Sequence, residues 1–97
     1  MSESVDLSIV IPCYNEEQRI PGFVISWEKF IRVESDRFFK TYPSVEIIFI
    51  NDGSRDQTEN LLKQVVPQLS NGTVIARFES LSMNQGKGAA VRRGFQL

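Results

Sequence analysis

The chain has 97 residues, of which 41% are hydrophobic and 24% are charged, and its formal net charge is -1. These ordinary globular proportions argue against disorder and against a coiled coil, and the length allows at most one small domain, residues 1–97. A charge so near zero gives no long-range field that would attract nucleic acid, so no nucleic-acid partner is expected. Histidine is absent and Cys13 is the only cysteine, which excludes Ser-His-Asp and Cys-His catalysis and cysteine or histidine metal clusters.

The start of the chain carries no targeting signal. Residues 1–6 are acidic and polar, whereas a signal peptide has a basic start and an apolar run. No stretch approaches the roughly 20 apolar residues that span a bilayer. We therefore expect a cytoplasmic protein.

The first half of the chain predicts a strand, a helix and a second strand. Residues 7–12 and 45–50 are almost continuously apolar, which is typical of strands buried on both faces of a parallel sheet. Between them, Pro21 favours a helix start, and apolar residues at three- and four-residue spacing predict a buried stripe up to residue 39. The members of this stripe are Phe23, Trp27, Phe30 and Ile31.

The second half repeats this alternation. Ser54 followed by Gln57 matches a capping box at the start of a helix that ends near Pro67. The run at residues 73–78 follows the turn Asn71-Gly72 and predicts a third strand. A third helix is expected from residue 88 or 89 onward. This β-α-β-α-β-α order predicts an α/β, Rossmann-like fold with a parallel sheet and helices on its faces.

Polar segments follow all three predicted strands, at residues 12–17, 51–56 and 84–88. Ligands of open parallel sheets bind at the carboxyl ends of the strands, so we expect a site there. Tyr14 is suited to packing on a base or ribose, and Glu16 or Asp52 to accepting from a hydroxyl. The alternatives are an Asn15 helix cap and an ordinary Asp-Gly turn at Asp52 and Gly53.

The Gly-Lys-Gly run at residues 86–88 does not match known phosphate motifs. Leu81 stands where a Walker A loop needs its first glycine, and Val91 stands at the last glycine of a dinucleotide fingerprint. Backbone amides at a helix start, with Lys87 and Arg92 nearby, are still suited to binding an anion. A solvated basic face is the alternative. Cys13 is expected to be buried packing rather than a nucleophile.

Taken together, the three segments resemble family 2 glycosyltransferases of the GT-A fold. The matching stretches are residues 8–17 (SIVIPCYNEE), 50–58 (INDGSRDQT) and 84–92 (NQGKGAAVR), in the order found in that family. Within the family, the chain is most similar to the dolichyl- and polyprenyl-phosphate hexosyltransferases. The long first helix and the Gly-Lys-Gly run with Arg92 favour the glucosyl branch.

The resemblance implies the site and the reaction. Its implied nucleotide-sugar-binding residues are Pro12, Tyr14, Glu16, Asp52, Gly53, Lys87 and Arg92. The implied parent enzyme transfers a hexose from a UDP- or GDP-sugar to a lipid phosphate with inversion, at the cytoplasmic face of a membrane. Its divalent metal (Mg²⁺ or Mn²⁺), its acceptor region and its catalytic base follow residue 97 in the family. We therefore expect a truncated N-terminal part, the nucleotide-binding half of a GT-A fold, without catalytic or metal-ligating residues.

Two other functions remain open from the sequence. A non-catalytic nucleotide-binding or interaction module would use an exposed sheet edge or an apolar patch. A sugar-nucleotide nucleotidylyltransferase has a related fold, but a glycine-rich signature after the first strand is absent here. Apolar surface left exposed would also favour self-association of the chain.

Overall fold

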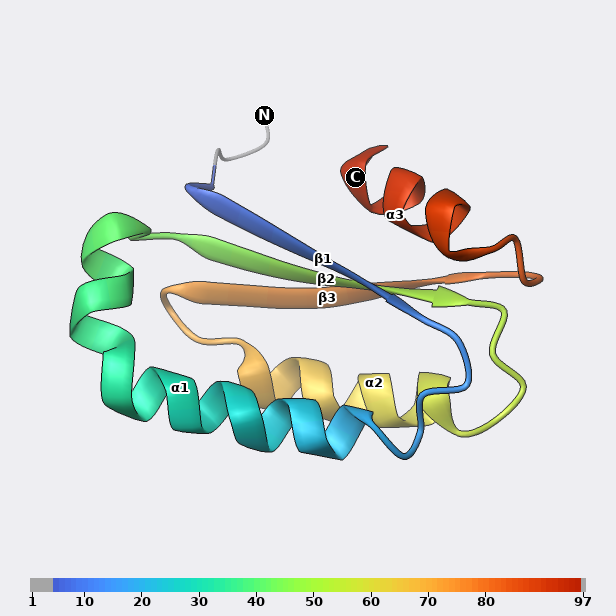
Figure 1. The fold of residues 1–97 in the computed structure, drawn as a ribbon, viewed down its shortest axis with the longest axis horizontal. Coiled ribbons are helices and arrows are strands. Elements are labelled where there is room, and N and C mark those ends of the chain that lie inside the picture. Colours follow the sequence, from blue (N-terminus) through green and yellow to red (C-terminus); the bar gives the residue numbers. More distant parts are fainter. Residues whose placement is uncertain (1–4, 97) are drawn as a thin grey trace.

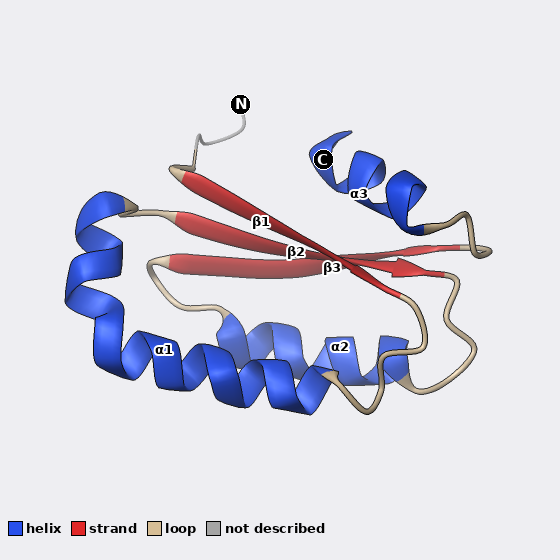
Figure 2. Ribbon diagram, in the orientation of Figure 1, coloured by secondary structure: helices blue, strands red, loops and turns tan. Residues whose placement is uncertain are grey.

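The structure is a computed structural model that describes residues 5–96, in which strands and helices alternate (Figures 1 and 2). Its elements are β1 (Leu7–Cys13), α1 (Ile20–Thr41), β2 (Val45–Asp52), α2 (Thr58–Leu69), β3 (Val74–Leu81) and α3 (Lys87–Gln96). All six predicted elements are present. The α/β fold with β-α-β-α-β-α order is therefore confirmed.

The three strands form one parallel sheet in the order β1-β2-β3. The central strand β2 is almost fully buried because it has a neighbouring strand on each side and helices on both faces. The register aligns Cys13 with Asn51 and Asp52 with Leu81. The carboxyl ends of all three strands therefore meet at one edge of the sheet.

The helices form two layers, one on each face of the sheet. Figures 1 and 2 show α1 and α2 together below the strands and α3 above them. Alternate residues of β2 contribute to the two cores. Ile47 and Phe49 belong to the cluster between the sheet and the helices α1 and α2, while Ile48 and Ile50 pack with Ala90 of α3. The period of two along a strand explains why a continuous apolar run suits this position.

Helix α1 buries its apolar stripe only in part. Phe23 contacts Phe49 of the sheet edge-to-face, with ring centroids 5.7 Å apart. The prediction that Phe30 is buried was wrong: its side chain is 40% exposed, although it contacts the rings of Trp27 and Phe38.

Among the described residues, no helix combines the length and apolar character that a membrane crossing needs.

The predicted capping box at the start of α2 is not formed. The helix begins at Thr58, and Gln57 at its N-cap makes no capping hydrogen bond through its side chain. The Ser54 hydroxyl instead accepts a hydrogen bond from the backbone amide of Asn15, 39 residues away. Asn15 is not a helix cap either, because α1 begins at Ile20 and Asn15 has a left-handed φ of 51°. A tertiary contact between two loops has replaced both local caps.

Gly94 allows α3 to approach β1 closely. A Cβ atom built on Gly94 would lie 2.3 Å from Cγ1 of Val10, which is closer than any real contact. Gly88, in the first turn of the same helix, would meet nothing within 4 Å. Substituting each glycine with alanine therefore distinguishes two effects: both substitutions raise helix propensity, but only the one at position 94 disturbs the packing of α3 on β1.

Replacing Gly94 with alanine should lower the free energy of unfolding by about 1 kcal/mol, because overpacking by about 1–3 kcal/mol outweighs a helix-propensity gain of about 1 kcal/mol. Urea denaturation measures this change. Gly88→Ala is the matched control and should leave stability unchanged or raise it. The loss at Gly94 should shrink in a Val10→Ala background. Equal effects of the two glycine substitutions would contradict the packing of α3 on β1.

Candidate functional site

Three loops meet at the carboxyl edge of the sheet, each following one strand. They are residues 14–19 after β1, 53–57 after β2 and 82–86 after β3. Loops at such an edge carry backbone amides that no strand or helix satisfies, so side chains must supply partners. The bonds that do so determine the geometry of the site.

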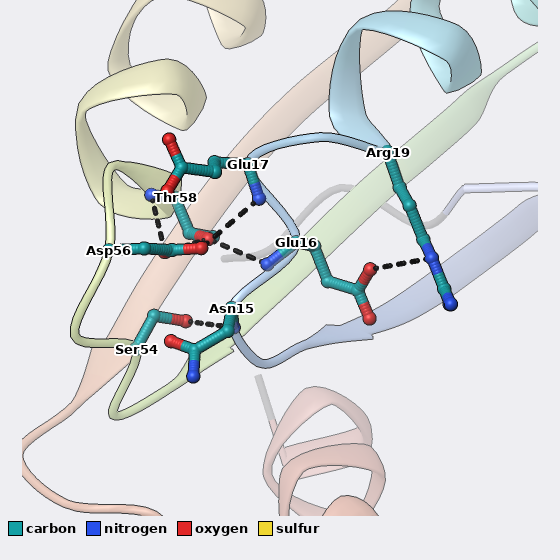
Figure 3. A network of polar contacts seen from close by, with 7 residues as sticks. All are labelled: Asn15, Glu16, Glu17, Arg19, Ser54, Asp56 and Thr58. Atoms are coloured by element: carbon teal, nitrogen blue, oxygen red, sulfur yellow. Dashed lines mark hydrogen bonds and ion pairs between the residues drawn. The ribbon is translucent and has the colours of Figure 1, made fainter.

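The loop after β1 is tied to the loop after β2 by a reciprocal pair of hydrogen bonds, of which Figure 3 draws the one between Asn15 and Ser54. The Asn15 amide donates to Oγ of Ser54 at 2.9 Å, and the Arg55 amide donates to Oδ1 of Asn15 at 2.9 Å. The left-handed backbone of Asn15 is one that asparagine tolerates better than most residues. This conformation turns the chain so that both bonds form.

A second set of bonds continues the same connection. The Glu16 amide donates to Oγ1 of Thr58 at 2.8 Å, and the Glu17 amide donates to Oδ2 of Asp56 at 3.3 Å. The hydroxyl and the amide of Thr58 both donate to Oδ1 of Asp56. The side chain of Glu16 remains outside this set and pairs with exposed Arg19 at 3.5 Å (Figure 3).

Asp52, at the end of β2, ties the sheet to the loop that precedes α3. Its carboxylate accepts hydrogen bonds from the amides of Gln85 at 2.7 Å and Gly86 at 2.9 Å, and from Nδ2 of Asn84 at 3.2 Å. The residue is only 2% exposed. A buried carboxylate needs such donors, and these three fix the position from which Lys87 begins α3.

A pocket of about 290 Å³ opens between these loops. It is lined by Pro12, Cys13, Tyr14, Glu16, Asp52, Asn84 and Lys87. Five of the seven predicted site residues therefore come together: Pro12, Tyr14, Glu16, Asp52 and Lys87.

The two other predicted site residues lie elsewhere. Gly53 lines an adjacent pocket of about 510 Å³, which shares the Tyr14 ring with the first pocket. Arg92 is exposed on α3 and lines neither pocket. Whether any of the seven residues contacts a nucleotide stays a prediction.

Three residues of the site were not singled out from the sequence. Asn84 lines the pocket and donates to Asp52, while Asp56 and Thr58 hold the loop after β1. Asn84 opens a polar segment shortly after the end of β3, and that position was the available signal. Asp56 and Thr58 gave only a local signal, a helix start, because their loop partners are about 40 residues away in the sequence.

Cys13 lines the pocket, but its thiol is unreactive. Its side chain is buried, and burial, followed by the nearby charge of Glu16, raises the pKa of the thiol to about 12. The thiolate is the nucleophilic form, so at neutral pH this cysteine is inert. The prediction that Cys13 is buried packing is confirmed.

The divalent metal implied by the resemblance does not fit the residues described here. Within residues 5–96, no cluster of three or more histidine, cysteine, aspartate or glutamate side chains is arranged to hold an ion. Asp52, the buried carboxylate of the pocket, already accepts three N–H groups. A metal in the reaction would therefore need ligands other than these side chains.

Comparison with known proteins gives a family and several relatives. Residues 8–97 match the family described as Glycosyl transferase family 2. A dolichyl-phosphate beta-glucosyltransferase of Dictyostelium discoideum is 36% identical over 92 residues, which cover 95% of this chain and 27% of that protein. The protein of that name from Homo sapiens is 36% identical over 95 residues, which cover 96% of this chain and 28% of the relative.

A bacterial relative is named for a different lipid phosphate. The undecaprenyl-phosphate 4-deoxy-4-formamido-L-arabinose transferase of Pseudomonas fluorescens is 37% identical over 90 residues, which cover 93% of this chain and 24% of that protein. The chain thus spans about a quarter of the length of the curated relatives it matches. These matches do not favour a non-catalytic interaction module.

Gly53 sits where the loops after β2 and β3 touch. Its φ is 68°, and an added Cβ would lie 2.4 Å from the backbone nitrogen of Asn84 and 2.4 Å from the carbonyl carbon of Met83. Gly53→Ala should therefore cost about 2–4 kcal/mol of stability, from left-handed strain and displaced backbone. Gly86→Ala is the control, because its φ of 93° brings strain but no contact within 4 Å. Urea denaturation should give Gly53→Ala a lower free energy of unfolding than Gly86→Ala, and the reverse order would contradict the contact between the two loops.

Asp56 should make stability depend on pH. Desolvation raises the pKa of its carboxyl, but bonds from the Thr58 hydroxyl, the Thr58 amide and the Glu17 amide outweigh this and leave the pKa below the ordinary value of 3.8. Its stabilisation is therefore present above about pH 4 and is lost as pH falls through the lowered pKa. Urea denaturation should find Asp56→Asn less stable than wild type at pH 7, with the difference shrinking towards pH 3. A difference independent of pH would contradict this assignment.

Proposed function

The chain belongs to glycosyltransferase family 2, and from this membership we propose that it binds the nucleotide-sugar donor of an enzyme that transfers a hexose to a lipid phosphate. The observation that carries the proposal is the pocket at the carboxyl edge of the sheet. Five side chains predicted to bind the donor line it, although they come from three separate segments: the end of β1 with the loop after it, the end of β2, and the start of α3. Relatives named for dolichyl- and undecaprenyl-phosphate support a polyprenyl-phosphate acceptor for the whole protein.

The exposed groups of the pocket are suited to the parts of a nucleotide sugar. The Tyr14 ring is 44% exposed and offers an apolar face to a base or ribose. Glu16 is half-buried and has a carboxylate that accepts from sugar or base hydroxyls. Asp52 also lines the pocket, and its carboxylate is likewise an acceptor for hydroxyls. UDP and GDP both fit this chemistry.

The diphosphate would lie against the start of α3. Lys87 is exposed there as the first residue of the helix, and it also lines the pocket. A helix start is favourable for anions because its unpaired amides and its dipole are positive. An ammonium at the same place adds a charge that pairs with phosphate. Arg92, further along the exposed side of α3, is proposed as a more distant contributor.

In the whole protein, a lipid-phosphate oxygen would attack the anomeric carbon from the face opposite the nucleotide and invert its configuration. The residues described here would bind and orient the donor, and none is assigned a bond-breaking role. Such an enzyme would work at the cytoplasmic face of a membrane, where a polyprenyl phosphate is accessible. The need for Mg²⁺ or Mn²⁺ belongs to the same proposal.

Calorimetric titration of the chain with UDP, GDP and their hexose conjugates, with and without Mn²⁺, tests donor binding. Tyr14→Ala and Lys87→Ala should each weaken binding about tenfold, or about 1.4 kcal/mol, by removing a stacking face and a phosphate partner. Both side chains are exposed, so thermal stability should hardly change.

Lys29→Ala, which removes an exposed ammonium on α1, is the control and should bind like wild type. The preferred base would identify the donor. A folded chain that binds none of these ligands, or binding insensitive to Tyr14 and Lys87, would refute the proposed site.

A further inference from the structure

Two residues outside the donor pocket hold the segment that carries Tyr14 and Glu16. Asp56 and Thr58, called here the anchor pair, lie at the entrance to α2 and do not line the pocket. The segment that they hold, residues 14–17, is called the donor loop. Figure 3 shows the anchor pair directly facing the backbone of Glu16 and Glu17.

The bonds form a directed chain. The Glu16 amide donates to the Thr58 hydroxyl, whose own proton goes to Oδ1 of Asp56. The second oxygen of Asp56 accepts the Glu17 amide. Because the hydroxyl must point its proton at Asp56, its lone pair is aimed at Glu16. Two successive amides of the donor loop are thus held by one carboxylate, one directly and one through a hydroxyl.

We propose that Asp56 and Thr58 are positioning residues of the donor site, which fix the donor loop so that Tyr14 and Glu16 are held in place before a nucleotide binds. This inference rests on the proposed function for its effect on affinity. The anchoring itself is a property of the chain without ligand. The two parts can therefore fail separately.

The burial of Thr58 strengthens its connection to the donor loop relative to the exposed bond between Asn15 and Ser54. Thr58 is 0% exposed, so water cannot replace its hydroxyl as a partner for the Glu16 amide. Leaving a buried donor without an acceptor costs about 1–3 kcal/mol. The Asn15–Ser54 bond is exposed, and water competes with it.

The chemistry of each position is restrictive. Serine at position 58 keeps the hydroxyl, whereas valine has nearly the same shape and accepts no hydrogen bond. Asparagine at position 56 has one oxygen in place of two. Whichever way its amide is turned, an NH₂ group faces either the Thr58 donors or the Glu17 amide.

Amide hydrogen exchange, followed by NMR, tests the anchoring without any ligand. In Thr58→Val the Glu16 amide should exchange at least tenfold faster, measured relative to the amides of β2. Asp56→Asn should accelerate both Glu16 and Glu17. Thr58→Ser should stay close to wild type, because the hydroxyl relay is retained. Unchanged exchange at Glu16 in Thr58→Val would overturn the inference.

Nucleotide affinity tests the consequence for the site. Thr58→Val and Asp56→Asn should weaken the binding of UDP or GDP, whichever the wild type prefers, by about tenfold, and Thr58→Ser should restore it. Val65→Ala is the matched control: Val65 is buried on the same helix but belongs to the core under the sheet. It should lower thermal stability by a similar amount while leaving both affinity and Glu16 exchange unchanged.

The outcomes separate the two proposals. If wild type binds no nucleotide but Glu16 exchange responds as described, the proposed function fails and the anchoring stands. If wild type binds nucleotide and the anchor variants bind equally well, the positioning role is refuted. If Val65→Ala loses as much affinity as Thr58→Val, general destabilisation explains the weaker binding of both variants. That result would equally overturn the inference.

Discussion

The site depends on one constraint: three parallel strands end at one edge, and the loops there carry amides that the sheet cannot pair. Side-chain carboxylates, hydroxyls and an amide oxygen meet this demand. Asp52 takes the amides before α3, while Asp56 and Thr58 take those of the donor loop. Each connects segments at least 30 residues apart, so the edge is held by side chains where the sheet stops.

The sequence predicted the sheet because β2 is buried on both faces, and burial leaves a continuous apolar run that can be read locally. The loops were harder. Ser54 looked like a helix cap because its spacing to Gln57 fits a capping box, yet its hydroxyl bonds to the amide of Asn15. Nothing local distinguishes these outcomes, because the competing partner lies 39 residues away and is nearby only after the sheet has formed.

The position of the pocket could be predicted because ligands of parallel sheets bind at the carboxyl ends of the strands. Pro12 and Tyr14 lie at or just beyond the end of the half-buried edge strand β1, Asp52 ends the buried strand β2, and all three line the pocket. The charge of Arg92 and its place in a matching stretch predict a site residue, but the direction of its side chain depends on how α3 is rotated about its axis. Its neighbours in sequence do not determine that rotation. Asp52 adds a complication: as well as facing the pocket it accepts three N–H groups, so its removal would disturb the loop before α3.

A division between buried and exposed groups follows. The buried groups, Asp52 and Thr58, accept hydrogen bonds from backbone amides. The exposed side chains of Tyr14 and Lys87 hold none of the described loops and are available to a ligand. Loops ordered in this way lose their conformational entropy when the chain folds, so less is lost on binding. Affinity should then depend on both sets in different ways: changing Tyr14 removes a contact, whereas changing Thr58 leaves every contact group present but raises the cost of bringing them together. The same loss of affinity would thus come with unchanged loop order in one case and with a loosened donor loop in the other.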